Sequence, residues 1–260
     1  MSRSALLNVM VQAALKAGKA LNRYFNEIEK LQVSLKGPGD YVTHADKKAE
    51  QIIFEELQYA RPDYGFIMEE RGEIPGKDKQ HRWIVDPLDG TTNFLHGLPF
   101  FAISIALERQ GQIVAAVIYN PVLDELFTAE KGGGVFLNDR RIRVANRRLL
   151  VDSIVATGIP SIAHPNHGQY ISELKNLMTE VASIRHLGAA SLNLAYVAAG
   201  KLDGYWENNL KPWDIAAGLL MVREAGGFVT DRSNRLDVLF NNSLVAGNEY
   251  IHKALLKLWS

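Results

Sequence analysis

The sequence of 260 residues predicts a layered fold that mixes helices and strands, and two patterns along the chain point to it. In the first half, short apolar segments separated by glycine-containing turns predict a mostly antiparallel sheet, so this half is expected to be α+β. In the second half, strands alternate with helices, which is typical of α/β layering. We expect two halves, residues 1–145 and 146–260, that pack as one compact unit because no flexible linker separates them.

The composition is that of an ordinary globular enzyme. The 29 basic residues balance the 29 acidic residues, so net charge argues neither for nor against a nucleic-acid partner. There is no cysteine, which excludes disulfides, thiolate metal sites and cysteine nucleophiles. We find no apolar segment of membrane length, and the N-terminal segment is too polar for a signal peptide. We therefore expect a soluble, cytoplasmic protein without membrane contact.

The N-terminal half is expected to begin with a helix that Ser4 caps and that ends near Asn26. A strand at 31–35 and an irregular loop rich in glycine and proline come next. A second helix begins near Thr43, and its first turn carries Asp46, where the helix dipole favours a carboxylate. Further strands are predicted at 64–68, 83–85, 101–107, 113–119, 125–129 and 134–137, with a polar loop at 71–81.

In the C-terminal half, glycine, proline and capping residues mark where the elements end. Strands are predicted at 153–157, 183–187, 202–206, 228–230 and 244–246. Helices are predicted at 169–182, from about 188 to 200, from 212 to the glycine pair at 226–227, and after the capping residue Asn248 to about 258.

The segment from Trp83 to Phe94 concentrates residues that carry chemistry. Asp86 and Asp89 follow a short buried strand, in a turn that contains proline. Carboxylates so close together repel each other, and burying either one without a partner is costly. A hard cation such as magnesium would relieve both problems, because it prefers oxygen ligands. Gly90 permits a close approach of the backbone, and the N–H groups after it would face an anion such as phosphate. The alternative is an ordinary Asp-Pro and Asp-Gly surface turn.

Other carboxylates stand at comparable positions. Glu69 and Glu70 end a predicted strand, and Asp214 lies in the first turn of a predicted helix. Enzymes of the α/β class build their sites at such junctions, so these residues are candidates for the same site. For Asp46 the alternative is that it serves only as a helix cap.

Four segments, in matching order and spacing, resemble the signatures of the inositol monophosphatase family. They are Lys36 to Asp46, Gly65 to Glu70, Asp86 to Asn93 and Trp213 to Gly218. The resemblance runs from about Leu6 to Leu256 and is strongest to the bacterial inositol-1-monophosphatase branch. It implies a layered αβαβα sandwich, Mg²⁺-dependent hydrolysis of a small phosphomonoester, inhibition by lithium, and a homodimer. The substrate it implies is myo-inositol 1-phosphate.

The resemblance also implies which residues bind metal. Glu69, Asp86 and the backbone carbonyl of Leu88 would hold one magnesium ion. Asp86, Asp89 and Asp214 would hold a second, and a third, looser ion would lean on Glu69 and water. Two or three Mg²⁺ ions per site are therefore expected.

The remaining implied roles concern water, phosphate and substrate. Asp46 and Thr91 would position the attacking water and help to deprotonate it, with Glu69 contributing to catalysis through the metal. The backbone N–H groups of Gly90 and Thr91 would bind the phosphate. Residues expected beside the substrate are Gly188, Ala190, Glu207 and Lys211, and those expected to support the metal ligands are Lys36, Asp40 and Glu70.

Three alternatives keep the chemistry and change the substrate to fructose 1,6-bisphosphate, histidinol phosphate or adenosine 3′,5′-bisphosphate. A further alternative is not enzymatic. The basic stretch of Arg140, Arg141, Arg143, Arg147 and Arg148 could contact RNA or the transcription machinery. No aromatic residues interleave with these arginines, so a solvated edge is the simpler interpretation of the stretch.

Overall fold

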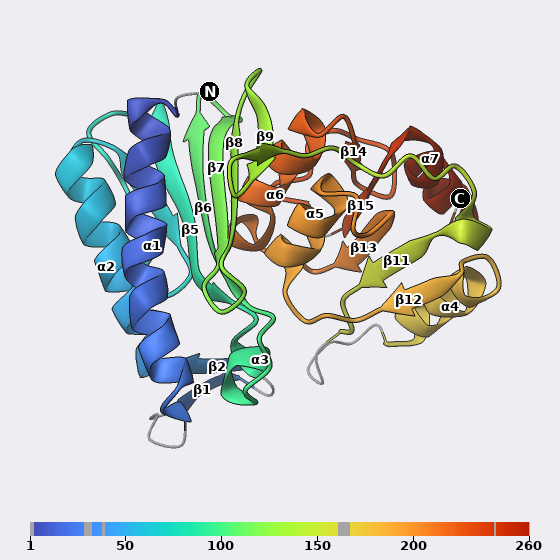
Figure 1. Ribbon diagram of the computed structural model, residues 1–260, viewed down its shortest axis with the longest axis horizontal. Coiled ribbons are helices and arrows are strands. Elements are labelled where there is room, and N and C mark those ends of the chain that lie inside the picture. The colour runs from blue at the N-terminus through green and yellow to red at the C-terminus, as the bar shows by residue number, and fades with distance from the viewer. Residues whose placement is uncertain (1–2, 29–32, 38–39, 161–166, 242, 260) are drawn as a thin grey trace.

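The computed structural model describes residues 3–28, 33–37, 40–160, 167–241 and 243–259, and for 33–37 and 40–42 it describes the backbone alone. Its elements form five layers in the order helix, sheet, helix, sheet, helix (Figure 1). This order confirms the αβαβα sandwich. Among the described residues, no helix combines the length and the apolar character needed to cross a membrane.

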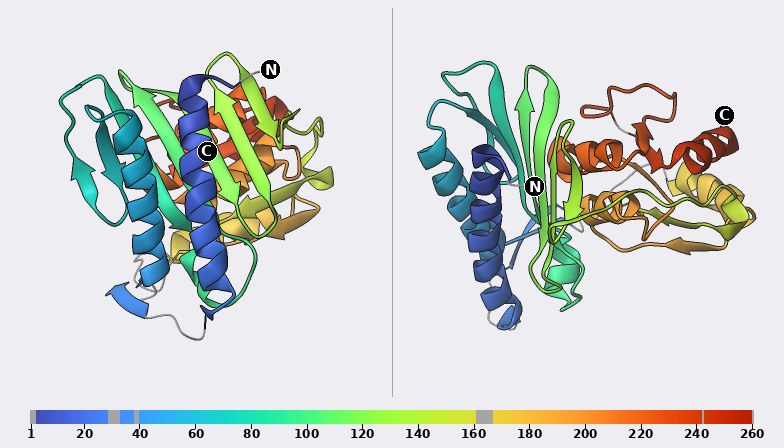
Figure 2. Two further views of the ribbon diagram at one scale, coloured as in Figure 1. Left: turned by 60° about the vertical axis from the view of Figure 1, so that its left-hand side comes forward. Right: turned by 45° about the horizontal axis from the view of Figure 1, so that its top comes forward.

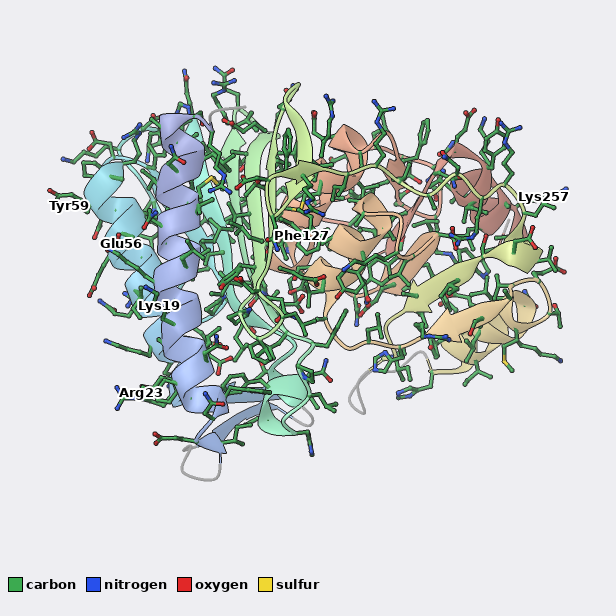
Figure 3. All side chains as sticks on the ribbon, viewed as in Figure 1. Lys19, Arg23, Glu56, Tyr59, Phe127 and Lys257 are labelled. Carbon is green, nitrogen blue, oxygen red and sulfur yellow. The ribbon has the colours of Figure 1, made fainter. Side chains whose placement is uncertain are left out.

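Two long helices form the first layer and lie across one face of the larger sheet (Figure 2). They are α1 (Ala5–Phe25) and α2 (His44–Ala60). Ser4 caps α1 as predicted, because its side-chain oxygen accepts a hydrogen bond of 3.1 Å from Leu7 N. The polar side of this layer faces solvent, where Figure 3 shows Lys19 and Tyr59 pointing away from the sheet.

The larger sheet has eight strands in the order β10-β9-β8-β7-β6-β5-β3-β4. They are β3 (Gly65–Met68), β4 (Gly72–Ile74), β5 (His81–Asp89), β6 (Ala102–Arg109), β7 (Gln112–Asn120), β8 (Glu125–Glu130), β9 (Gly134–Leu137) and β10 (Arg140–Arg141). Only β3 and β5 pair in parallel, so the prediction of a mostly antiparallel sheet is confirmed.

Two short edge strands of this sheet were not expected. The segment 71–81 was predicted to be a loop, but β4 lies within it and pairs with β3. The two-residue strand β10 closes the opposite edge. Both are too short for a period-two pattern to show in the sequence. A separate ribbon of two antiparallel strands, β1 (Val33–Gly37) and β2 (Asp40–Thr43), replaces most of the irregular loop predicted before α2.

Strand β5 differs from the prediction in a way that shapes the site. It was expected to end before Asp86, in a turn, but it continues to Asp89. Asp86 lies opposite Ser104 and Asp89 opposite Ala102, so three steps on β5 match two on β6. One extra residue is therefore accommodated as a β-bulge, a position that tolerates Pro87 without its N–H. In a regular strand, residues three apart point to opposite faces, and the extra residue lets both aspartates share one face.

The other three layers come from the C-terminal part of the chain (Figure 1). The middle helices are α5 (Ala190–Ala198) and α6 (Pro212–Glu224). The second sheet, in the order β12-β11-β13-β15-β14, contains β11 (Ile154–Thr157), β12 (Ser183–Arg185), β13 (Gly204–Asn208), β14 (Phe228–Thr230) and β15 (Ser243–Gly247). The outer helices are α4 (His167–Met178) and α7 (Glu249–Leu258), and α4 ends four residues earlier than predicted.

The middle helices are apolar on nearly every side. Eight consecutive residues of α6, from Ile215 to Val222, are buried, as expected for a helix enclosed by other layers. The two helices also approach closely, since a Cβ on Gly218 would lie 2.4 Å from Cβ of Leu194. Phe127 of β8 packs into the same core, between the larger sheet and these helices (Figure 3). The tight packing fixes where α5 and α6 begin, and both begin at the site described next.

Candidate active site

The site lies where the two parts of the chain meet. Strand β5 leads through Gly90 into the short helix α3 (Thr91–Leu95). Gly90 has a φ of 94°, in the left-handed region that favours glycine. A Cβ on Gly90 would lie 3.2 Å from the Gly188 carbonyl oxygen and from the side chain of Ala189, just before α5. The end of β5 therefore packs directly against the beginning of α5.

Four predicted ligand carboxylates gather at this junction. Asp86 and Asp89 are buried, with 2% and 9% of their surfaces exposed. Burial raises the pKa of Asp86 well above its usual range, and the charges of Glu69, Asp89 and Asp214 raise it further. Burial is also the main cause that raises the pKa of Asp214, and the charge of Asp89 is the second. Residues from β5, from α6 and from the turn after β3 thus form one acidic cluster.

Three of these carboxylates have no cationic partner among the described side chains. Within the described part of the chain, no lysine or arginine forms an ion pair with Asp86, Asp89 or Asp214. Nor do any three described carboxylate or imidazole groups already stand in a metal-binding arrangement, as expected for like charges that repel each other. The donors are all oxygen atoms, so a hard divalent cation such as Mg²⁺ fits the cluster by chemistry and by charge.

Helix α5 holds Asp89 in place. The backbone N–H and the hydroxyl of Ser191 both donate to Oδ2 of Asp89, at 2.7 and 2.5 Å, and Ala190 N donates to Oδ1 at 3.2 Å. Burial raises the pKa of Asp89 to about 6 despite these hydrogen bonds. Two donors occupy Oδ2, so Oδ1 is the oxygen with capacity left for a cation. Sequence reasoning missed Ser191, whose only signal was a serine at the start of a helix.

Asp214 is held by its own helix. Its Oδ2 accepts a 2.8 Å hydrogen bond from the backbone N–H of Lys211, the residue that precedes α6. Asp214 therefore serves as a cap and also belongs to the acidic cluster, two roles that the helix dipole makes compatible. The Lys211 side chain itself is exposed at the rim.

Asp46 and Thr91 are brought together as a pair from α2 and α3. The Thr91 hydroxyl lies 3.2 Å from Oδ1 of Asp46 and 3.0 Å from the carbonyl oxygen of Leu88. Thr43 donates twice to Oδ2 of Asp46, from its N–H at 2.8 Å and its hydroxyl at 2.5 Å. Burial raises the pKa of Asp46. Asp46 caps α2 and still presents Oδ1 to Thr91, so capping is not its only contact.

A second buried acid stands behind the end of β3. Glu50 is 1% exposed, accepts a 2.9 Å hydrogen bond from the backbone N–H of Glu70, and forms an ion pair with Arg71, whose Nε lies 3.2 Å away. Glu50 lies one helical turn after Asp46, on the same face of α2. It fixes the turn that carries Glu69 and Glu70. Sequence reasoning missed Glu50, although its spacing from Asp46 was a usable signal.

The expected substrate-side residues line the C-terminal side of the cluster. Glu207 stands near the end of β13, and burial of its carboxyl group raises its pKa to about 7, with Asp89 adding to the rise. Gly188 has a φ of 80° and packs against the side chain of Asn93. Lys36 and Asp40 lie in β1 and β2, where the side chains fall outside the described part of the structure.

The basic stretch is partly engaged with the protein itself. Nη1 of Arg147 lies 3.0 Å from Oδ1 of the buried Asp203, and the Arg148 guanidinium sits 4.7 Å from the ring centre of Tyr250. The remaining arginines of the stretch are exposed, namely Arg140, Arg141 and Arg143.

The fold and the sequence have clear relatives. The chain matches the model of the inositol monophosphatase family over residues 2–260. An inositol-1-monophosphatase of Mesorhizobium japonicum is 66% identical over 99% of this chain and 97% of its own length. The Nus factor SuhB of Escherichia coli strain K12 is 44% identical over 96% and 94%. A crystal structure of extragenic suppressor protein suhB from Bartonella henselae superposes with a TM-score of 0.96 and 63% identity, covering 98% of each chain. The chain therefore belongs to the inositol monophosphatase family.

Proposed function

We propose that this phosphatase hydrolyses myo-inositol 1-phosphate to inositol and phosphate in a Mg²⁺-dependent reaction. The observation that carries the proposal is the pairing of Thr91 with Asp46 beside the acidic cluster, where burial and the neighbouring carboxylates raise the pKa of Asp86 well above its usual range. A relative that is 66% identical is named an inositol-1-monophosphatase, which supports the choice of substrate.

The acidic cluster is the proposed place for two or three Mg²⁺ ions. The first ion would be held by Glu69, Asp86 and the Leu88 carbonyl. The second would be held by Asp86, Asp89 and Asp214. A third, looser ion would be bound by Glu69 and water. Bound Mg²⁺ would neutralise charge on the transferring phosphoryl group and lower the pKa of a water molecule. Ser191 and Lys211 hold one oxygen each of Asp89 and Asp214, which would limit how far these carboxylates must move to surround an ion.

Thr91 and Asp46 are the proposed route for the proton of the attacking water. Thr43 occupies Oδ2 of Asp46, which leaves Oδ1 to accept a proton from the Thr91 hydroxyl. The Thr91 oxygen can in turn accept the proton of a water molecule. Its second contact, to the Leu88 carbonyl oxygen, fixes the hydroxyl beside the bulge of β5. A weakly basic carboxylate would suffice here, because a bound cation would lower the pKa of the attacking water.

Phosphate and polyol are proposed to occupy the junction between the two parts of the chain. The backbone N–H groups of Gly90 and Thr91 would donate to phosphate oxygens where α3 begins. The substrate hydroxyl groups would meet residues on the C-terminal side, namely Gly188, Ala190, Glu207 and Lys211. Three residues would support the metal ligands from outside, namely Lys36, Asp40 and Glu70. We also propose that the protein is a homodimer and that lithium inhibits it.

A panel of four phosphate esters tests the proposed function. We expect phosphate release from myo-inositol 1-phosphate to require Mg²⁺ and to exceed release from fructose 1,6-bisphosphate, histidinol phosphate and adenosine 3′,5′-bisphosphate. Faster release from one of the other three esters would retain the reaction class and replace the substrate. A protein that binds Mg²⁺ but releases phosphate from none of them would overturn the proposal.

Glu207→Ala is expected to raise the KM for myo-inositol 1-phosphate by about tenfold, because a charged hydrogen bond to a substrate hydroxyl is lost. The value of kcat should fall less, since Glu207 lies away from the Thr91–Asp46 pair. Steady-state kinetics on the four esters measures both effects. Glu249→Ala, which removes an exposed glutamate from the outer helix α7, is the control. A substrate profile identical to that of the wild type would remove Glu207 from the substrate site.

A second candidate function is contact with RNA or the transcription machinery. The relative in Escherichia coli that is 44% identical is named a Nus factor, and all five arginines of the basic stretch are exposed, including Arg140, Arg141 and Arg143. Such contact would weaken steeply with added salt, because lysine and arginine binding to phosphates releases counterions. It would also persist in Asp214→Asn, which separates it from catalysis. RNA binding that does not respond to substitution of these arginines would exclude this surface.

A further inference from the structure

The Glu207 carboxylate occupies space that any side chain at position 158 would need. A Cβ on Gly158 would lie 1.8 Å from Cδ of Glu207 and 2.0 Å from each of its carboxylate oxygens. The φ of Gly158 is not in the left-handed region, so space and not backbone conformation excludes a side chain there. The overlap falls on the mobile end of a glutamate side chain, so a larger residue would displace the carboxylate without opening the core.

The register of the second sheet explains this proximity. Strands β11 and β13 run in parallel, with Thr157 beside Trp206. The next residue along the chain is Gly158, one position past the end of β11, and its counterpart on β13 is Glu207. Neighbouring side chains in adjacent strands project from the same face of a sheet, so a side chain at 158 would enter the place that Glu207 uses.

Tyr205 holds the Glu207 carboxylate from its own strand. The two residues are separated by one position, so both side chains project from the same face of β13. The Tyr205 hydroxyl donates a hydrogen bond to Oε2 of Glu207, and Tyr205 is completely buried. The rotamer of Glu207 is therefore set from two sides, by the absence of a side chain at 158 and by the hydroxyl at 205.

We propose that Gly158 is a specificity-determining residue, which leaves room for the Glu207 carboxylate to face the hydroxyl groups of a phosphorylated polyol. Tyr205 is the positioning residue that keeps the carboxylate there. This inference rests on the proposed function, and it adds the reason why Glu207 can reach the substrate. Gly158 acts through Glu207 and not on the phosphate, so its effect must depend on the hydroxyl groups of the substrate.

A double-mutant cycle with two substrates tests the inference. The variants are Gly158→Ala, Glu207→Ala and the double variant, each assayed with myo-inositol 1-phosphate and with p-nitrophenyl phosphate, which has no polyol hydroxyl groups. For Gly158→Ala we expect the ratio of kcat/KM for the inositol ester to kcat/KM for the aryl ester to fall about tenfold, as for loss of one charged hydrogen bond. The double variant should show the same ratio as Glu207→Ala alone, because coupled residues are not additive.

Gly168→Ala is the matched control, since a Cβ at that position of α4 meets nothing within 4 Å. Tyr205→Phe is an independent arm that removes only the hydroxyl, and it should lower the same ratio even if Gly158→Ala fails to fold. Equal losses on both esters, or a Gly158→Ala effect that adds fully to Glu207→Ala, would overturn the inference. Aryl ester turnover without any preference for the polyol would instead overturn the proposed substrate, and silence on both esters would overturn the proposed function.

Discussion

Asp214→Asn and Asp89→Asn are each expected to abolish Mg²⁺-dependent phosphate release while the protein remains folded. Each substitution removes a charged oxygen from the acidic cluster, so the affinity for divalent cations is expected to fall with it. Removing one group that stabilises transition-state charge costs about 10²–10³-fold in rate, and loss of an ion should exceed that range. Asparagine keeps the shape of the side chain, and its oxygen can still accept a hydrogen bond from the backbone N–H groups where α5 and α6 begin.

The same substitutions, which lower activity, should raise the stability of the metal-free protein. Without Mg²⁺, the buried carboxylates repel each other, so replacing one by a neutral amide raises the free energy of unfolding. Added Mg²⁺ should raise the melting temperature of the wild type and have little effect on the variants. Thermal melts with and without Mg²⁺, next to phosphate release, measure both effects. Asp203→Asn is the control, because this buried aspartate pairs with Arg147 and its loss should lower stability. Turnover within tenfold of the wild type would show that Asp89 and Asp214 are not ligands.

Thr91→Val and Asp46→Asn are each expected to lower kcat by about 10²–10⁴-fold, the usual contribution of a positioned proton-transfer group. KM should change little, because neither side chain is placed against the polyol. The double variant should be about as slow as either single variant, since the two groups act as one unit. Steady-state kinetics at saturating Mg²⁺ measures these effects.

Two controls make the assignment of the pair specific. Thr91→Ser retains the hydroxyl and should restore most of the activity. Thr92→Val changes the next residue, whose side chain is exposed, and should behave like the wild type. Losses at Thr91 and Asp46 that multiply fully in the double variant would mean that the two residues act separately.

The sequence predicted best those features whose signals are local. Ser4 and Asn248 both cap the helices that follow them, because a capping side chain and its N–H partners lie within three residues of each other. The β6–β7 hairpin was predictable for the same reason. The four acidic residues were also expected to meet, because strand ends and helix starts share one edge of an α/β layer. The division at residues 145 and 146 stays a prediction.

The bulge of β5 could not be predicted, because its sequence carries the residues of a turn. Pro87 and Gly90 favour a turn in isolation, and only the pairing of β5 with β6 extends the strand past Pro87 to Asp89. Tertiary pairing thus overrode a local preference. This correction matters for the site, since the bulge is what turns Asp86 and Asp89 to the same face.

The residues that hold the site were missed because their partners are distant or sterically defined. Nothing in the sequence around Tyr205 indicates that its hydroxyl donates a hydrogen bond to Glu207, since the hydroxyl of a buried tyrosine can have many different acceptors. Gly158 matters for the space it leaves, which only the register of β11 with β13 reveals. Ser191 bonds to Asp89 across 102 positions of sequence, beyond the reach of any local pattern.

That last contact has a consequence for the order of events during synthesis. Contacts between distant residues form late, because the intervening loop must close before they are gained. The ribosome releases Asp86 and Asp89 long before it releases Ser191 and Asp214, so a nascent chain carries the acidic pair without the helix starts that orient it. We therefore expect catalytic competence to appear only when the C-terminal helices have docked, and an incomplete chain to be inactive.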